Sequence, residues 1–131
     1  MKSTEKPWTW FTQPQPDREY VALATYLPVS RWSAMPRFGR YTLASIRQLS
    51  RSEGVLGYSL RAAPHRRSFW TLTVWNDAAS LSRYVRAQPH RDAMRWLRTS
   101  AMGEFHSARW TIDGAAVPPS WDVALARLET S

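Results

Sequence analysis

Residues 68–75 carry no charged side chain, and this segment constrains the fold more than any other. Its residues are mostly β-branched, aromatic or aliphatic, which is typical of a strand. Alternate positions form two mainly apolar sets without a charged side chain, Phe69-Thr71-Thr73-Trp75 and Trp70-Leu72-Val74. Neither set is polar enough to face water, so both faces of the strand need cover.

Three further strands are predicted from the hydrophobic pattern. Residues 20–27 form an uncharged run that ends at Pro28, and residues 55–61 form a second strand. The short connection at 62–67 makes 55–61 and 68–75 a hairpin, so the two strands are antiparallel. Residues 104–112 give the fourth strand, before a turn at Asp113-Gly114.

Helix signals separate these strands. Residues 36–50 have an apolar stripe at three-residue steps, with Pro36 suited to the first turn. Asn76-Asp77 is a cap signal for a helix after the third strand. Pro89 indicates the start of another helix, which we expect to end at Gly103. A short C-terminal helix follows residues 118–120.

The order of elements predicts an α+β fold of the ferredoxin-like, split β-α-β type. We expect a four-stranded antiparallel sheet with helices on one face, plus the C-terminal helix, in a single domain over residues 19–131. Residues 1–18 contain three prolines and are expected to form an irregular N-terminal arm. Because the helices can cover only one sheet face, we expect a second copy of the sheet to cover the other, giving a homodimer.

Composition excludes several classes of function. The chain has no cysteine, so disulfides, thiolate metal sites and thiol catalysis are excluded. No segment approaches the ~20 apolar residues of a membrane span, and the N-terminus lacks a signal-peptide pattern, so we expect a cytoplasmic protein with no membrane partner. Glycine-rich phosphate loops, serine elbows and histidine pairs with metal spacing are also missing from the sequence.

The net charge is +8, from 18 Lys+Arg against 10 Asp+Glu. A basic balance is compatible with nucleic acid or anionic ligands. Several arginines recur at helical spacing in one region, namely Arg83, Arg86, Arg91, Arg95 and Arg98. We interpret them as a solvated helix face and do not expect nucleic acid as the partner.

The chain resembles the dimeric α+β barrel superfamily, in particular the antibiotic-biosynthesis monooxygenases. The resemblance spans roughly residues 19–129 and rests on residues 57–61 (Gly-Tyr-Ser-Leu-Arg), 69–77 (Phe-Trp-Thr-Leu-Thr-Val-Trp-Asn-Asp), Pro89-His90, Ala93-Met94 and 118–121 (Pro-Pro-Ser-Trp). It implies a ligand site between the sheet and the helices of one subunit, with the dimer formed by the sheets. The superfamily contains cofactor-free oxygenases of polyphenolic substrates, haem-degrading and haem-dependent enzymes, and isomerases.

His90 is the candidate catalytic histidine. In the first turn of a helix, the partial positive charge of the helix end disfavours imidazolium. A neutral ring can act as a base, bind a phenol or ligate haem iron, although it can also simply pack at a helix kink. The ligand histidine of haem-degrading relatives aligns near Met94 rather than His90. His65 is expected in the exposed hairpin turn, and His106 on the fourth strand.

Arg61 and Arg109 are expected on equivalent faces of the second and fourth strands. The small polar residues expected to share that face are Ser59, Thr71, Thr73 and Ser107. This face could bind a carboxylate or an enolate, or it could form polar contacts across the dimer. The sequence leaves both interpretations open.

Aromatic residues are the candidate substrate-binding groups, and core packing is the alternative role for each. They are Trp32, Tyr58, Trp70, Trp75, Trp96 and Trp110. By strand alternation, Tyr58, Trp70 and Trp110 lie on the face opposite to the arginines, which we expect to pack against the helices.

The sequence hypothesis is a small-molecule enzyme that oxidises an aromatic or polyketide-like substrate. His90 and Arg61 would be catalytic, and Arg109 would bind substrate together with Tyr58, Trp70, Trp75, Trp96 and Trp110. No cofactor is expected. One alternative is a haem-binding or haem-dependent enzyme with His90 as iron ligand, and the other is a non-catalytic ligand-binding dimer.

Overall fold

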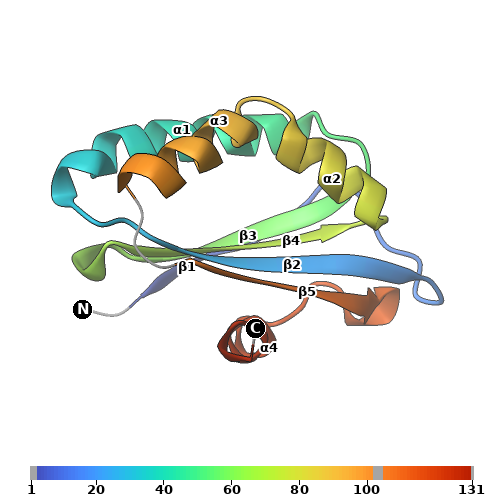
Figure 1. The fold of residues 1–131 in the computed structure, drawn as a ribbon. Coiled ribbons are helices and arrows are strands. Elements are labelled where there is room, and N and C mark those ends of the chain that lie inside the picture. The colour runs from blue at the N-terminus through green and yellow to red at the C-terminus, as the bar shows by residue number, and fades with distance from the viewer. Residues whose placement is uncertain (1–2, 102–104, 131) are drawn as a thin grey trace.

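The computed structural model describes residues 3–101 and 105–130, which form a sheet with helices on both faces (Figure 1). All strand pairs in the sheet are antiparallel, and its order is β1-β3-β4-β2-β5. The strands are β1 (Thr4–Trp10), β2 (Glu19–Pro28), β3 (Val55–Ala63), β4 (Ser68–Trp75) and β5 (His106–Asp113). The helices are α1 (Met35–Ser50), α2 (Ala78–Arg86), α3 (His90–Trp96) and α4 (Trp121–Glu129).

The predicted α+β, ferredoxin-like class is confirmed. The elements β2-α1-β3-β4, then α2 with α3, then β5 follow the split β-α-β order, and a π-type turn over Leu97–Ala101 extends α3. The expected helix end at Gly103 and strand start at Glu104 lie outside the described residues. No helix in the described ranges is long and apolar enough to cross a membrane.

The sheet has five strands among the described residues, so the prediction of four was wrong. The extra strand, β1, comes from the segment predicted to be an irregular arm, and it pairs with β3 at the sheet edge. Pro7 lies at the register irregularity between Lys6 and Thr9, where a missing N–H is tolerated. The approach of β1 depends on Gly57, because a Cβ there would lie 2.4 Å from the carbonyl oxygen of Thr9.

The two sheet faces are covered by different helices (Figure 1), whereas the sequence predicted helices on only one face. Helices α1, α2 and α3 cover one face, and α4 packs on β2 and β5 of the other, hereafter the α4 face (Figure 1). Small side chains make room for α4, since Ala22, Ala24 and Ala124 are all fully buried there. Ser120 caps α4 by accepting a hydrogen bond from the Val123 N–H.

The orientation of the side chains also differs from the prediction. Tyr58 pairs with Thr73, and Arg61 pairs with Trp70, so the parity of β3 relative to β4 is opposite to that expected. The threonine set of β4 lies under α1–α3, whereas Trp70 packs on the core of the α4 face. The hairpin turn sets this register, and it ends at Arg67, which has the left-handed φ of 52°.

Candidate functional site

A cavity of about 280 Å³ lies between the sheet and helices α1–α3. Its lining on the sheet consists mostly of short hydroxyl residues and aliphatic residues, including Thr25, Thr71, Thr73, Ser107 and Leu23. Its lining on the helices includes Phe38, Ile46, Leu81 and Met94. The short threonine side chains leave the space open, whereas larger residues at these positions would fill it as core.

His90 lines this cavity as the first residue of α3. Its backbone N–H donates to Oε1 of Gln48 at 2.8 Å, and its Nδ1 lies 3.4 Å from the Val85 carbonyl oxygen. A proton on Nδ1 that points at this carbonyl leaves Nε2 as the acceptor. The imidazole also packs against the Tyr84 ring, with a centroid separation of 4.7 Å.

The environment of His90 favours the neutral imidazole. Burial lowers its pKa below the usual 6.5, the Val85 carbonyl partly opposes this shift, and the positive charge of Arg98 lowers the pKa further. The ring is therefore mainly uncharged at neutral pH, which is the form that accepts a proton.

Two tyrosines line the cavity, and each hydroxyl has a hydrogen-bond partner within the protein. Tyr84 is buried, its hydroxyl donates to the Ser45 carbonyl at 3.3 Å, and burial raises its pKa so that it stays a neutral phenol. The Tyr58 hydroxyl accepts a hydrogen bond from the Lys6 ammonium of β1. Because Lys6 has no proton acceptor, the Tyr58 hydroxyl proton is left for another partner.

Arg109, one of the predicted binding residues, lines the cavity from β5. Arg98 lies in the π-helical segment after α3 and lines the cavity from the helical side. Both side chains are also exposed to solvent, so they lie where the cavity opens.

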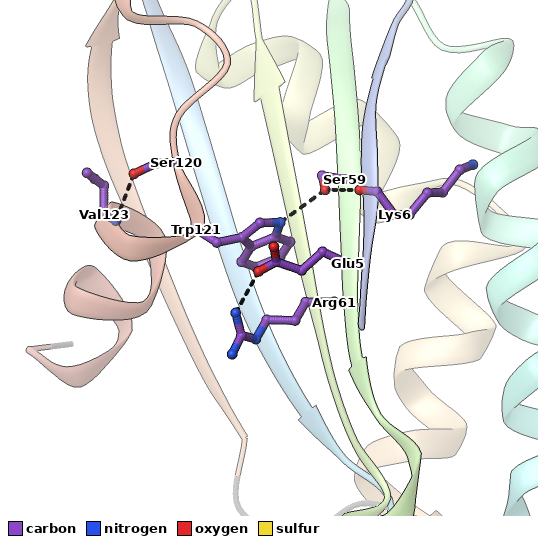
Figure 2. Close-up of polar contacts among 7 residues, drawn as sticks. All are labelled: Glu5, Lys6, Ser59, Arg61, Ser120, Trp121 and Val123. Carbon is purple, nitrogen blue, oxygen red and sulfur yellow. Dashed lines mark hydrogen bonds and ion pairs between the residues drawn. The ribbon is translucent and has the colours of Figure 1, made fainter. Parts of the chain in front are cut away.

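Arg61 lies on the α4 face and does not line the cavity, so the expectation that it shares a face with Arg109 was wrong. Figure 2 shows Arg61 paired with Glu5, next to Trp121 of α4. Nη1 of Arg61 lies 2.6 Å from Oε2 of Glu5, and the Arg61 guanidinium lies over the Trp70 ring. Trp121 Nε1 donates to the hydroxyl of Ser59, which in turn donates to the Lys6 carbonyl (Figure 2).

The predicted aromatic residues separate into three groups. Tyr58 lines the cavity, whereas Trp70 and Trp110 pack in the core of the α4 face. Trp75 is fully buried behind Tyr84, with its Nε1 donating to Thr73. The core packing interpretation therefore holds for Trp70, Trp75 and Trp110.

The remaining aromatic and histidine candidates lie outside the cavity lining. Trp96 packs on Tyr41 of α1 with a centroid separation of 5.3 Å. Trp32 is 57% exposed and carries Arg67 over its ring. His65 is exposed in the hairpin turn, and His106 is exposed on β5, which lies at the sheet edge opposite to β1.

Sequence reasoning missed four residues that shape the site. They are Lys6, Gln48, Tyr84 and Arg98. From the sequence, Arg98 was interpreted only as part of a solvated helix face and Tyr84 was assigned no role, although both line the cavity with His90. No local pattern marks Lys6 or Gln48, because each acts on a residue more than 40 positions away.

The residues around His90 do not fit a haem. The Tyr84 ring lies beside the imidazole, and the cavity is close to the lower end of the roughly 300–1,000 Å³ typical of ligand pockets. This space suits a ligand of two or three fused rings better than a porphyrin. Within residues 3–101 and 105–130, no group of three or more His, Asp or Glu side chains could hold a metal ion.

The chain matches no protein-family model and no curated protein sequence. Solved structures do share its fold. SnoaB, a cofactor-independent oxygenase from Streptomyces nogalater, is 16% identical with a TM-score of 0.56, over 78% of this chain and 99% of that one. A proposed monooxygenase from Fusobacterium nucleatum is also 16% identical, with a TM-score of 0.63 over 81% of this chain and 47% of that one.

A third match is PA3566 from Pseudomonas aeruginosa, which is 17% identical with a TM-score of 0.60, over 70% of this chain and 91% of that one. At these identities the likeness establishes the fold alone. The chain therefore has the α+β fold that SnoaB and these other proteins share.

Proposed function

We propose that the protein is a cofactor-independent oxygenase that oxidises a fused-ring phenolic substrate in the cavity beside His90. The observation that carries this proposal is the position of His90 in the wall of a largely apolar cavity, with Nδ1 directed at the Val85 carbonyl. Burial lowers the pKa of this imidazole and so favours the neutral ring. The apolar wall excludes water from the anion that a base generates. The shared fold with a cofactor-independent oxygenase supports the same assignment.

In this proposal His90 is the general base. Its Nδ1–H is held by the Val85 carbonyl, so Nε2 is free to take the proton from the substrate. The substrate anion then reduces O₂ at an adjacent ring carbon, where a carbon–oxygen bond forms. Loss of water leaves a carbonyl group, so one O₂ converts a CH₂ group into C=O plus H₂O without an external reductant.

Tyr58 would stabilise the anion. The Lys6 ammonium donates to its oxygen, which leaves the phenolic proton to point at a substrate oxygen. A donor fixed in place before the reaction stabilises charge that develops there. This role replaces the one expected for Arg61, which lies on the α4 face.

Oxygen uptake tests the proposal directly. Protein treated with a chelator is mixed with a hydroxylated anthrone in air, and O₂ consumption and ¹⁸O incorporation from ¹⁸O₂ are measured. We expect one O₂ consumed per product, with one ¹⁸O atom incorporated and no added cofactor. Uptake that requires added haem, flavin or metal contradicts the proposal.

The second candidate is a ligand-binding protein without turnover. It is favoured by one observation, namely that no Asp or Glu in the described lining forms an acid–base pair with His90. Tight binding of the anthrone, measured anaerobically, with no uptake above the uncatalysed rate in air would support this candidate instead.

A further inference from the structure

The cavity opens beside β5. Ser107 and Arg109 of β5 line the cavity, and both are exposed to solvent. Helices α1–α3 therefore leave the cavity side of this strand uncovered. Arg98 is likewise exposed and lines the cavity from the segment after α3. A ligand that enters the cavity at this opening therefore meets two guanidinium groups.

These two arginines give the cavity a net positive lining. No Asp or Glu is among the described residues that line it. Within the described part of the chain, neither Arg98 nor Arg109 forms an ion pair, whereas Arg61 on the α4 face pairs with Glu5. The positive charge at the opening is thus available to a ligand.

Both arginines are carried by anchored backbone. Arg109 lies on β5 opposite Leu23 of β2, near the middle of that strand pair. Leu97, next to Arg98, is buried, and the carbonyl of Ser100 accepts a hydrogen bond from the Arg31 guanidinium. Anchored donors lose less conformational freedom when they bind a ligand than donors on free loops do.

We propose that Arg98 and Arg109 bind a carboxylate on the substrate, while its rings occupy the apolar interior beside His90. This inference rests on the proposed function and names its substrate class, an aromatic carboxylic acid. A guanidinium matches a carboxylate through two parallel N–H···O bonds. A phosphate is the poorer match, because the sequence has no glycine-rich loop that would add backbone N–H donors.

A matched ligand pair tests the inference by binding alone. The dissociation constants of 3-hydroxy-2-naphthoate and its carboxamide are measured by calorimetry at pH 7.5 for the unmodified protein, Arg98→Gln, Arg109→Gln and the double variant. Arg95→Gln is the control, since Arg95 is exposed on α3 and does not line the cavity. We expect the carboxylate to bind on the order of tenfold tighter than the carboxamide.

The preference should fall in each single variant, disappear in the double variant and persist in Arg95→Gln. Equal binding of the two ligands to the unmodified protein overturns this inference but leaves the cavity as an aromatic site. A preference that survives in the double variant also overturns it. Failure of both ligands to bind overturns the inference together with the proposed aromatic site.

Discussion

The backbone N–H of His90 donates to the side-chain oxygen of Gln48 at 2.8 Å, although the two residues are 42 positions apart. The Gln48 side-chain nitrogen also donates to the Tyr84 carbonyl at 2.9 Å. One side chain of α1 therefore holds the end of α2 and the start of α3 together. This contact fixes where the imidazole enters the cavity.

Replacing Gln48 with alanine should lower both stability and turnover. The change removes the acceptor for His90 N–H and the donor to the Tyr84 carbonyl, which should cost roughly 1–3 kcal/mol of unfolding free energy. We expect kcat to fall more than KM changes, because His90 shifts while the rest of the cavity remains. Urea unfolding and steady-state kinetics measure the two effects.

Gln88→Ala is the matched control for this variant. The Gln88 side chain is exposed, and its hydrogen bonds within the described residues are both with Asp92. Its loss should leave kcat nearly unchanged. Equal loss of kcat in the two variants would show that Gln48 has no special role in positioning His90.

The stability of the protein should depend on pH through His90. Its pKa is lowered in the folded state, mainly by burial, so the unfolded chain binds the proton more tightly. Stability is therefore highest above pH 6.5 and falls as the pH drops from 6.5 towards the lowered folded pKa. Urea unfolding of His90→Gln between pH 5 and 8 should show a weaker dependence, and an identical dependence would refute this assignment.

Replacing Gly57 with alanine should detach the edge strand β1 from β3. A Cβ at Gly57 would also lie 2.5 Å from Nε1 of Trp8, so Gly57→Ala should cost about 1–3 kcal/mol of unfolding free energy. Faster amide hydrogen exchange across Thr4–Trp10 would report the loss of β1. The control is Gly39→Ala in α1, where nothing lies within 4 Å, and it should stabilise the protein by roughly 0.5–1 kcal/mol. Changes of the same sign in the two variants would contradict the dependence of β1 on Gly57.

The homodimer expected from the sequence remains a prediction. Helix α4 packs on β2 and β5, so we expect the partner to contact the part of the α4 face near β1. Trp10 of β1 is 38% exposed there and packs edge to face on Trp8. Light scattering should give twice the 15.1 kDa chain mass. Trp10→Arg should yield monomers, and Trp32→Arg should not. A monomeric mass for the unmodified protein would contradict the prediction.

The elements with strong local signals could be predicted from the sequence. The uncharged segment 68–75 is a strand, and the polar connection before it makes a hairpin. Pro89 lies at the start of α3 and places His90 in its first turn. These features depend on residues close together in the chain, so periodicity and proline geometry were sufficient to identify them.

Features that depend on distant pairing could not be predicted. The segment that forms β1 combines Pro7 with charged and aromatic residues, as edge strands and loops both can. The hairpin register, which places Arg61 opposite Trp70, depends on the left-handed conformation of Arg67. A one-residue slip exchanges the two faces of a strand, so this single detail moved Arg61 away from the cavity.

The kinetics of His90→Ala decide whether His90 is the base. Turnover of a hydroxylated anthrone is compared for the unmodified protein, His90→Ala and the control His65→Ala, whose histidine is exposed in the hairpin turn. We predict that kcat falls by about 10²–10⁴-fold in His90→Ala, with ligand affinity largely kept and His65→Ala unaffected. Unchanged kcat in a folded His90→Ala variant that still binds the ligand would rule out His90 as the base.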